Sequence, residues 1–173
     1  MAFAEMMKET QFDKITVYDL CQRAGVRRAT FYKHYKDKYD FFSHIVSLLQ
    51  ENIANNLTDV KRKDSPLDYY IRYVEEIISY FIKNDVIISN MLSSEIFPIM
   101  LNLIMMGTYN SLKNDLMGDV SNGLVLAADP ETTAGFMNGG ISHILVRWAR
   151  LRYCTKEELL TEVREIISKL ISK

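Results

Sequence analysis

Apolar residues recur along this chain at intervals of three and four positions, and nowhere with the strict alternation of a half-buried strand. Val17, Leu20, Cys21 and Ala24 form one such stripe, which indicates a buried helix face. Together with caps and prolines, the same period predicts helices over residues 2–9, 17–24, 28–35, 37–57, 65–83, 129–153 and 155–171. Residues 85–117 are also predicted to be helical, with Pro98 breaking or starting a helix there. The sequence therefore predicts an all-α protein of eight or nine helices, with a loop over 118–128.

The second and third predicted helices are joined by a glycine turn. Thr16 is a suitable N-cap for the second helix, and Asp19 three residues later can complete a capping box. Gly25 follows that helix, where a left-handed residue costs least without a Cβ, and Val26 is expected to enter the small core below. The third helix would bury Phe31 and, one turn later, Tyr35. This order predicts a helix-turn-helix.

Positive charge is concentrated in the same segment. The chain has a formal net charge of −1 and an ordinary globular composition, 48% hydrophobic and 25% charged. Residues 14–38, however, hold seven Lys and Arg residues against two Asp residues, a net charge of +5. A short basic segment on an acidic body is typical of a domain that neutralises phosphates.

The outward face of the third helix carries the side chains that suit base recognition. With its aromatic residues turned inward, this helix presents Arg28, Ala29, Thr30, Tyr32 and Lys33 to a groove. Arg28 can make a forked contact to guanine, and Ala29 and Thr30 can meet a thymine methyl group or a phosphate. In a helix-turn-helix the second of the two helices lies in the major groove.

Two overlapping runs of this segment resemble the N-terminal signature of the TetR family of transcriptional regulators. They are FDKITVYDLCQRAGV, residues 12–26, and GVRRATFYKHYKDKYDFF, residues 25–42. The similarity covers residues 10–45. It implies a helix-turn-helix DNA-binding domain over residues 1–45 and a helical effector-binding and dimerisation domain over residues 46–173. It also implies base or groove contacts from Arg28, Ala29, Thr30 and Lys33, and phosphate contacts from Thr16, Tyr18, Tyr32, His34 and Lys38.

A weaker resemblance covers FMNGGISHILVRWARLRYCTKEEL, residues 136–159, which is similar to the penultimate helix and following turn of a TetR subgroup. In that family the last two helices pair with those of a second subunit. Small residues here allow a close approach of helices, as at Gly139 and Gly140, and Trp148 and Leu151 supply apolar area. The resemblance therefore implies a homodimer through the last two helices, which would match a palindromic operator in double-stranded DNA.

A ligand pocket is the hypothesis for the middle of the chain. Five of the nine methionines lie between residues 87 and 117, and methionine is common on surfaces that accept varied apolar partners. The expected pocket walls are Tyr73, Tyr80, Met91, Phe97, Met105, Tyr109 and Phe136. Plain core packing is the alternative for these residues.

Other chemistry finds little support in the sequence. Its three histidines are scattered, and no catalytic triad, metal-ligand spacing or phosphate-binding glycine loop occurs, so we expect neither an enzyme nor a cofactor. Cys21 and Cys154 fit no disulfide framework or metal site, and no apolar run is long enough for a membrane span. We expect a cytoplasmic protein that does not bind membranes.

The sequence thus favours a sequence-specific DNA-binding transcriptional regulator, acting as a repressor that a small apolar or aromatic ligand releases. The alternative is a protein-interaction module, or a ligand-independent co-regulator, that retains the helix-turn-helix shape. It is motivated by the short first helix, in which Lys8 is the sole basic residue.

Overall fold

A computed structural model describes residues 2–57 and 65–172 of the chain, and the part described is helical apart from one short strand pair. The N-terminal part consists of α1 (Ala2–Glu9), a 3₁₀ turn (Phe12–Lys14), α2 (Val17–Ala24), α3 (Arg28–His34) and α4 (Lys38–Asn56). The C-terminal part consists of α6 (Pro66–Lys83), α7 (Asp85–Leu92), α8 (Phe97–Ser121), α9 (Pro130–Leu151) and α10 (Lys156–Leu170). The predicted all-α class is confirmed. The basic segment Lys61–Lys63 lies outside the described residues.

Short-range capping explains where the C-terminal helices begin. The side chains of Ser65, Asp129 and Thr155 each accept a hydrogen bond from a backbone N–H in the first turn of α6, α9 and α10. Proline follows the first two of these caps, and Pro98 stands in the first turn of α8. These starts agree with the sequence prediction.

Two predictions for the end of α8 and the loop after it were wrong. The helix continues through Gly118 to Ser121, four residues beyond the predicted end at Met117. The predicted loop contains β1 (Val125–Leu126), which pairs antiparallel with β2 (Ile171–Ser172). Strands of two residues are too short to show an alternating pattern, so periodicity does not predict them.

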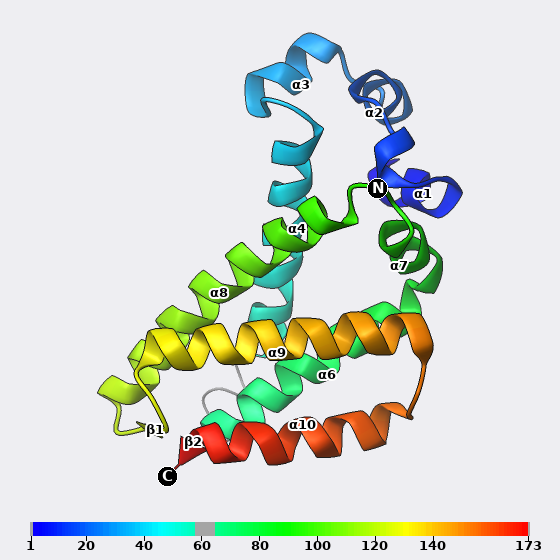
Figure 1. The fold of residues 1–173 in the computed structure, drawn as a ribbon. Coiled ribbons are helices and arrows are strands. Elements are labelled where there is room, and N and C mark those ends of the chain that lie inside the picture. The colour runs from blue at the N-terminus through cyan, green and yellow to red at the C-terminus, as the bar shows by residue number, and fades with distance from the viewer. Residues whose placement is uncertain (1, 58–64, 173) are drawn as a thin grey trace.

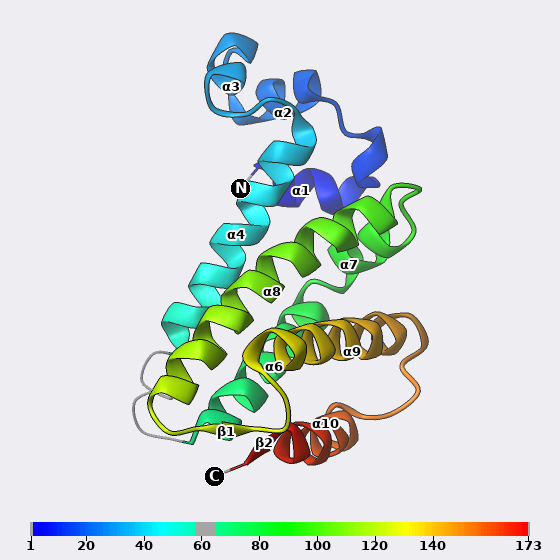
Figure 2. The ribbon, with the colours of Figure 1, turned by 60° about the vertical axis from the view of Figure 1, so that its left-hand side comes forward.

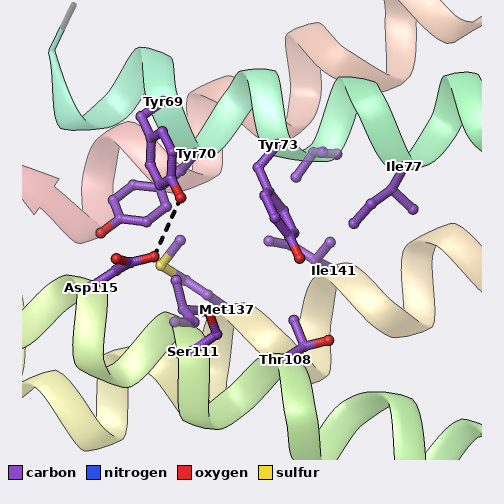
Figure 3. A pocket seen from close by; sticks show the side chains of 11 residues that line it. Tyr69, Tyr70, Tyr73, Ile77, Thr108, Ser111, Asp115, Met137 and Ile141 are labelled. Carbon is purple, nitrogen blue, oxygen red and sulfur yellow. Dashed lines mark hydrogen bonds between the residues drawn. The ribbon is translucent and has the colours of Figure 1, made fainter. Parts of the chain in front are cut away.

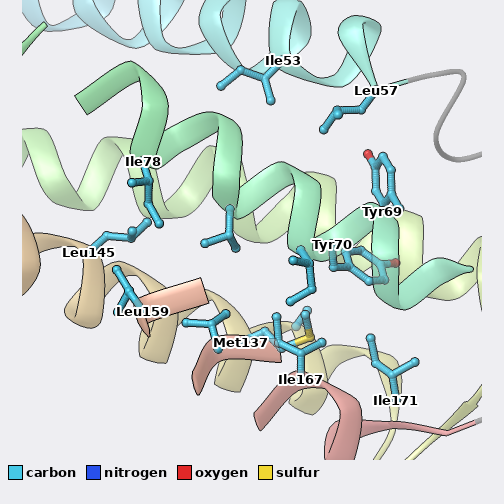
Figure 4. Close-up of a cluster of buried hydrophobic side chains, with 14 of the residues drawn as sticks. Ile53, Leu57, Tyr69, Tyr70, Ile78, Met137, Leu145, Leu159, Ile167 and Ile171 are labelled. Carbon is cyan, nitrogen blue, oxygen red and sulfur yellow. The ribbon is translucent and has the colours of Figure 1, made fainter. Parts of the chain in front are cut away.

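The larger core lies in the C-terminal part, between α6, α9, α10 and the end of α4 (Figure 4). Ile78 of α6 and Leu159 of α10 are almost completely buried there, and Trp148 of α9 donates its indole N–H to Cys154 O at 3.0 Å. α8 and α9 pack against each other toward the C-terminal end of α8 and the N-terminal end of α9, and diverge from there (Figure 1). This core holds the C-terminal helices together in a body below the N-terminal helices.

A second core joins the N-terminal helices to that body. It contains Phe3 and Met7 of α1, Phe12, Phe42 of α4, and Met100 of α8. α4 runs continuously from the N-terminal helices down along α8, across the predicted domain boundary at residue 45 (Figure 2). Movement in the body is therefore mechanically linked to the N-terminal helices.

Side-chain hydrogen bonds also join α1 and the turn after it to α7 and the segment that follows α7. Ser94 Oγ donates to Asp13 Oδ1 at 2.6 Å, and Gln11 Nε2 donates to Ser93 O at 3.1 Å. Asn90 Nδ2 of α7 donates to Met7 O of α1 at 2.8 Å. The hydrogen bond from Ser94 lowers the pKa of the Asp13 carboxyl.

Candidate nucleic-acid interface

The predicted capping box orients α2. Thr16 Oγ1 accepts from Asp19 N at 3.1 Å, and Thr16 N donates to Asp19 Oδ2 at 3.2 Å. The Thr16 hydroxyl also donates to Asp19 Oδ2. The backbone N–H groups of Thr16 and Asp19 have no carbonyl partner within the helix, and these side chains supply one for each. The capping box therefore fixes the direction in which α2 leaves the 3₁₀ turn.

The turn after α2 has the predicted left-handed glycine. Gly25 has φ +67°, and Val26 N donates to Cys21 O at 3.0 Å, which closes the helix end. The expected burial of two residues here was wrong, because Val26 is 44% exposed and Ala24 is exposed as well. In the described part of the chain, no other helix covers α2 and α3 where Ala24 and Val26 lie, so neither of these side chains reaches the core.

Aromatic packing fixes α3 against α4. The rings of Phe31, Tyr35 and Phe41 lie 5.1 to 5.8 Å apart, centroid to centroid, and Phe31 is buried. This contact turns the opposite side of α3 outward. Every predicted base- or groove-contacting residue of this helix is exposed: Arg28, Ala29, Thr30, Tyr32 and Lys33.

The basic side chains of the segment divide into two groups. Arg23 forms an ion pair with Glu9, and Lys14 forms one with Asp13. Within the described residues, no carboxylate is paired with Arg27, Arg28, Lys33 or Lys36, which lie on the turn, on α3 and just after it. The Arg28 guanidinium lies 5.8 Å from the centroid of the Tyr32 ring, which is 48% exposed. The cations available to a polyanion thus gather around the exposed face of α3.

Lys38 begins α4, and its side chain is held by contacts within the protein. Its ammonium group donates to Phe12 O at 3.2 Å, Asp13 O at 3.0 Å and Ile15 O at 2.9 Å, and it lies over the Phe12 ring. Burial lowers the pKa of this side chain. Lys38 therefore joins the start of α4 to the 3₁₀ turn, an arrangement that favours a structural role over the predicted phosphate contact.

The remaining predicted phosphate contacts lie on the outer surface. Tyr18 is 54% exposed and its hydroxyl accepts from Gln22 Nε2 at 2.5 Å, and His34 is exposed at the end of α3. Thr16 is exposed too, with its hydroxyl engaged by Asp19. These side chains and the α3 face belong to the same small N-terminal unit (Figure 1).

The body contains an apolar cavity of about 180 Å³ between α4, α6, α7, α8 and α9. Four of the predicted pocket residues line it: Tyr73, Tyr80, Met91 and Phe97. Met105 and Tyr109 do not line it, and Phe136 is 69% exposed on the outer face of α9, so its prediction was wrong. Phe136 follows buried Ala134 by two positions, which places it about 200° around the helix from the packed face.

The sequence prediction missed important walls of this cavity. Phe3 and Met7 of α1 line it, together with Gln50 of α4. Gln50 Nε2 donates to Thr108 Oγ1 of α8 at 2.7 Å, which gives the apolar walls one polar pair. The apolar stripe of α1 predicts that one face of this helix is buried. It does not predict which helices, distant in sequence, pack against that face.

A smaller hollow of about 50 Å³ adjoins this cavity and shares Tyr73, Ile77 and Thr108 with it (Figure 3). Tyr69 OH donates to Asp115 Oδ2 at 3.3 Å, and Tyr70 OH donates to Asp119 Oδ2 at 2.7 Å. Burial, reinforced by these carboxylates, raises the pKa of both phenols. Both phenols are therefore neutral donors that tie α6 to α8.

The described residues contain no group of three or more His, Cys, Asp or Glu side chains that could hold a metal ion. In the same part of the chain, no single helix has the length and apolar character needed to cross a membrane, and only α7 and α8 taken together, bent by 115°, meet that test.

Comparison with known proteins matches residues 2–45 to the bacterial regulatory proteins of the tetR family. A relative, the HTH-type dhaKLM operon transcriptional activator DhaS of Lactococcus lactis subsp. lactis (strain IL1403), is 28% identical over 75 residues. That alignment spans 43% of this chain and 40% of the length of the relative.

Solved structures share the fold over nearly the whole chain. A putative TetR-family transcriptional regulator from Syntrophomonas wolfei has a TM-score of 0.70 and 16% identity, over 94% of this chain and 87% of that one. The regulator FadR from Bacillus subtilis, solved in complex with stearoyl-CoA, has a TM-score of 0.68 and 18% identity, over 98% of this chain and 96% of that one. Residues 2–45 thus match the helix-turn-helix segment of the tetR family of bacterial regulatory proteins, and the chain as a whole shares its fold with solved TetR-family regulators.

Proposed function

We propose that the protein binds a palindromic operator in double-stranded DNA as a homodimer, and that a small apolar or aromatic ligand releases it. The observation that carries the DNA-binding part is the exposed face of α3. Arg28 and Lys33 stand on that face without acidic partners among the described residues, and packing against α4 fixes its direction. Arg28, Ala29, Thr30 and Lys33 are the proposed base or groove contacts. Thr16, Tyr18, Tyr32 and His34 are the proposed phosphate contacts.

The operator test is a titration of labelled promoter fragments, taken from genes adjacent to the coding sequence, over a series of salt concentrations. Binding dominated by phosphate contacts falls steeply as salt rises. Arg28→Ala should weaken binding to the preferred sequence by about 1–3 kcal/mol while leaving nonspecific binding nearly unchanged. Arg72→Ala is the matched control, because Arg72 is also exposed but lies on α6 and pairs with Glu75.

The two outcomes separate the proposal from its alternative. Salt-sensitive, Arg28-dependent binding supports a DNA-binding regulator. Absence of binding to any duplex at low salt would refute it and favour the protein-interaction module instead.

The dimer is proposed from the exposed apolar side chains of α9 and α8. Phe136 of α9 is 69% exposed, and Met106 of α8 is exposed as well. The helices touch close to both residues, because Asn138 Nδ2 donates to Met105 O at 3.0 Å. A Cβ added at Gly139 or Gly140 would meet nothing within 4 Å, so a second copy has room to approach here. A surface of this kind suits an isologous contact.

The sequence suggested pairing through the last two helices, α9 and α10. Exposure favours α8 as the companion of α9, because α10 has one large exposed apolar residue, Ile166, on an otherwise polar outer surface. Phe136→Glu should convert the dimer to a monomer in analytical ultracentrifugation, and Ile166→Glu should leave it intact. The reverse pattern would assign the interface to α10.

The ligand is proposed from the apolar cavity, whose walls come from both parts of the molecule. Phe3 and Met7 belong to the N-terminal unit, and Tyr80 and Met91 belong to the body. A ligand that fits better in one arrangement of these walls than in another shifts the protein toward that arrangement. The stearoyl-CoA found in the similar FadR supports an apolar occupant.

The direction of control is proposed as repression. DhaS, the Lactococcus lactis relative, is named an activator, so the sign needs its own measurement. A reporter gene behind the bound promoter should be expressed more strongly when the protein is deleted. Lower expression after deletion would make the protein an activator and would refute repression.

A further inference from the structure

A charged groove adjoins the apolar cavity where α7 meets the C-terminal end of α9. The groove has a volume of about 270 Å³ and is lined by Asp85, Ile88, Ser89, Leu92, Ser93, Ala149, Arg150 and Arg152. Ile88 and Leu92 line the apolar cavity as well. The groove and the cavity therefore adjoin each other at these two apolar residues.

Arg150 stands at this junction. Its guanidinium lies 5.2 Å from the centroid of the Phe97 ring, and it donates to Leu92 O at 3.4 Å. Phe97 and Leu92 both line the apolar cavity. The positive charge is thus held at the edge of an apolar space, where it does not have to be buried.

Arg152 is held by an unusual backbone conformation. It caps α9 with φ +46°, a left-handed position that glycine normally occupies. Its guanidinium lies 4.0 Å from the centroid of the Trp148 ring. Non-glycine residues in this region carry a conformational cost and cluster at functional sites. In this conformation the Arg152 side chain supplies a second cation beside the groove.

The balance of charge in the groove is positive. Asp85 is its single acidic residue, and one of its carboxylate oxygens already accepts from Val86 N at 2.8 Å. In the described part of the chain, neither Arg150 nor Arg152 forms an ion pair with an acidic side chain. The two guanidinium groups therefore retain donors for an anion.

We propose that the cavity and the groove together bind a single-chain anionic amphiphile, with its apolar part in the cavity and its acidic group between Arg150 and Arg152. The inference rests on the proposed function in taking the cavity as the ligand site. A cavity of 150 Å³ holds a benzene molecule, so about 180 Å³ suits an apolar part of one ring or of about six to eight carbons. The acidic group is a carboxylate or a phosphate, since a guanidinium fork suits either.

The test compares three ligands of equal chain length by calorimetric titration of the full chain: octanoate, 1-octanol and octylamine. Octanoate should bind about ten-fold more tightly than octanol, because a charge-assisted hydrogen bond is roughly twice as strong as a neutral one. In the double variant Arg150→Gln, Arg152→Gln, the octanoate-to-octanol ratio of affinities should fall to about one. Arg147→Gln is the matched control, because Arg147 lies over the Tyr153 ring, away from the groove, and its loss should preserve the ratio.

The ratio is the readout because Arg150 also contacts Phe97. A variant that merely loosens the packing would weaken octanoate and octanol alike and leave their ratio unchanged. An unchanged ratio in the double variant would therefore overturn the inference. Equal binding of octanoate and octanol by the unaltered protein would do so too, as would absence of binding by all three ligands.

Tighter binding of octylamine than of octanoate would also overturn it, because an ammonium group is attracted by a carboxylate such as that of Asp85 and repelled by the two guanidinium groups. Operator binding is measured separately. Intact operator binding without a preference for octanoate refutes this inference alone, whereas an octanoate preference without operator binding refutes the proposed regulator alone.

Discussion

Replacing Lys38 by methionine separates a structural role from a DNA contact. In the structure its ammonium group donates to three backbone carbonyls, those of Phe12, Asp13 and Ile15. Methionine retains most of the apolar stem but none of the donors. Phe12 O also accepts from Ile15 N at 3.1 Å and keeps that hydrogen bond. The change therefore mainly removes the donor to the Asp13 and Ile15 carbonyls.

The expected loss follows from those two carbonyls. An acceptor left without its donor costs about 1–3 kcal/mol, and the lower part of that range applies because the site is partly buried. We therefore expect Lys38→Met to lower the free energy of unfolding by about 2–3 kcal/mol. For a chain of this size, about 2–4 °C of Tm corresponds to each kcal/mol, so Tm should fall by about 4–12 °C.

The assay is thermal unfolding followed by circular dichroism, with Lys36→Met as the matched control. Lys36 is exposed two residues earlier and has no acidic partner among the described residues, so its loss should change stability by about 0.5 kcal/mol or less. DNA titrations of the folded Lys38→Met variant over a salt series complete the test. An unchanged Tm, with a salt slope reduced by about one, would show that Lys38 binds a phosphate and would refute the structural assignment.

Two further predictions concern contacts between elements that are distant in sequence. Ser94→Ala should raise the pKa of Asp13 toward its ordinary value, because the Ser94 hydrogen bond is the main cause of its lowering, and an unchanged carboxyl titration by NMR would contradict this. Since the folded-state pKa of Asp13 lies below its unfolded value, its contribution to stability is present above the unfolded-state pKa and is lost as pH falls through the folded-state pKa. Tyr70→Phe removes the donor to Asp119 Oδ2 and should destabilise the protein by about 1–3 kcal/mol in guanidinium unfolding, whereas a neutral effect would mean that water replaces the phenol.

Local chemistry made the helix-turn-helix predictable. The capping box of Thr16 and Asp19 and the left-handed Gly25 depend on residues within four positions of each other, so the sequence contains all the information they need. The inward direction of Phe31 follows from helical spacing in the same way. Direct contact with DNA remains a prediction for the exposed residues of α3.

Long-range contacts were not predictable in this way. The three carbonyls that surround Lys38 lie 23 to 26 residues before it, and the sequence alone favoured a phosphate for its charge. Phe136 was predicted to be a wall of the pocket, but the packed face of α9 is formed by Ala134, Met137 and Leu145, and Phe136 lies outside it. An apolar residue type is compatible with a place in a pocket wall. Whether the side chain lies there depends on which face of its helix packs against the rest of the protein.

The walls of the apolar cavity explain how its occupancy can reach the proposed DNA-binding helices. Phe3 and Met7 line the cavity from α1, and α1 packs directly against α2 and α7. Because Asn90 of α7 donates to Met7 O, α1 cannot move away from the ligand without either breaking that bond or carrying α7 with it. A ligand whose apolar part is larger than about 180 Å³ must displace α1 or one of the helices of the body. In a dimer, a displacement of α1 alters the separation of the two α3 helices, and a palindromic operator tolerates only one such separation, close to one turn of DNA.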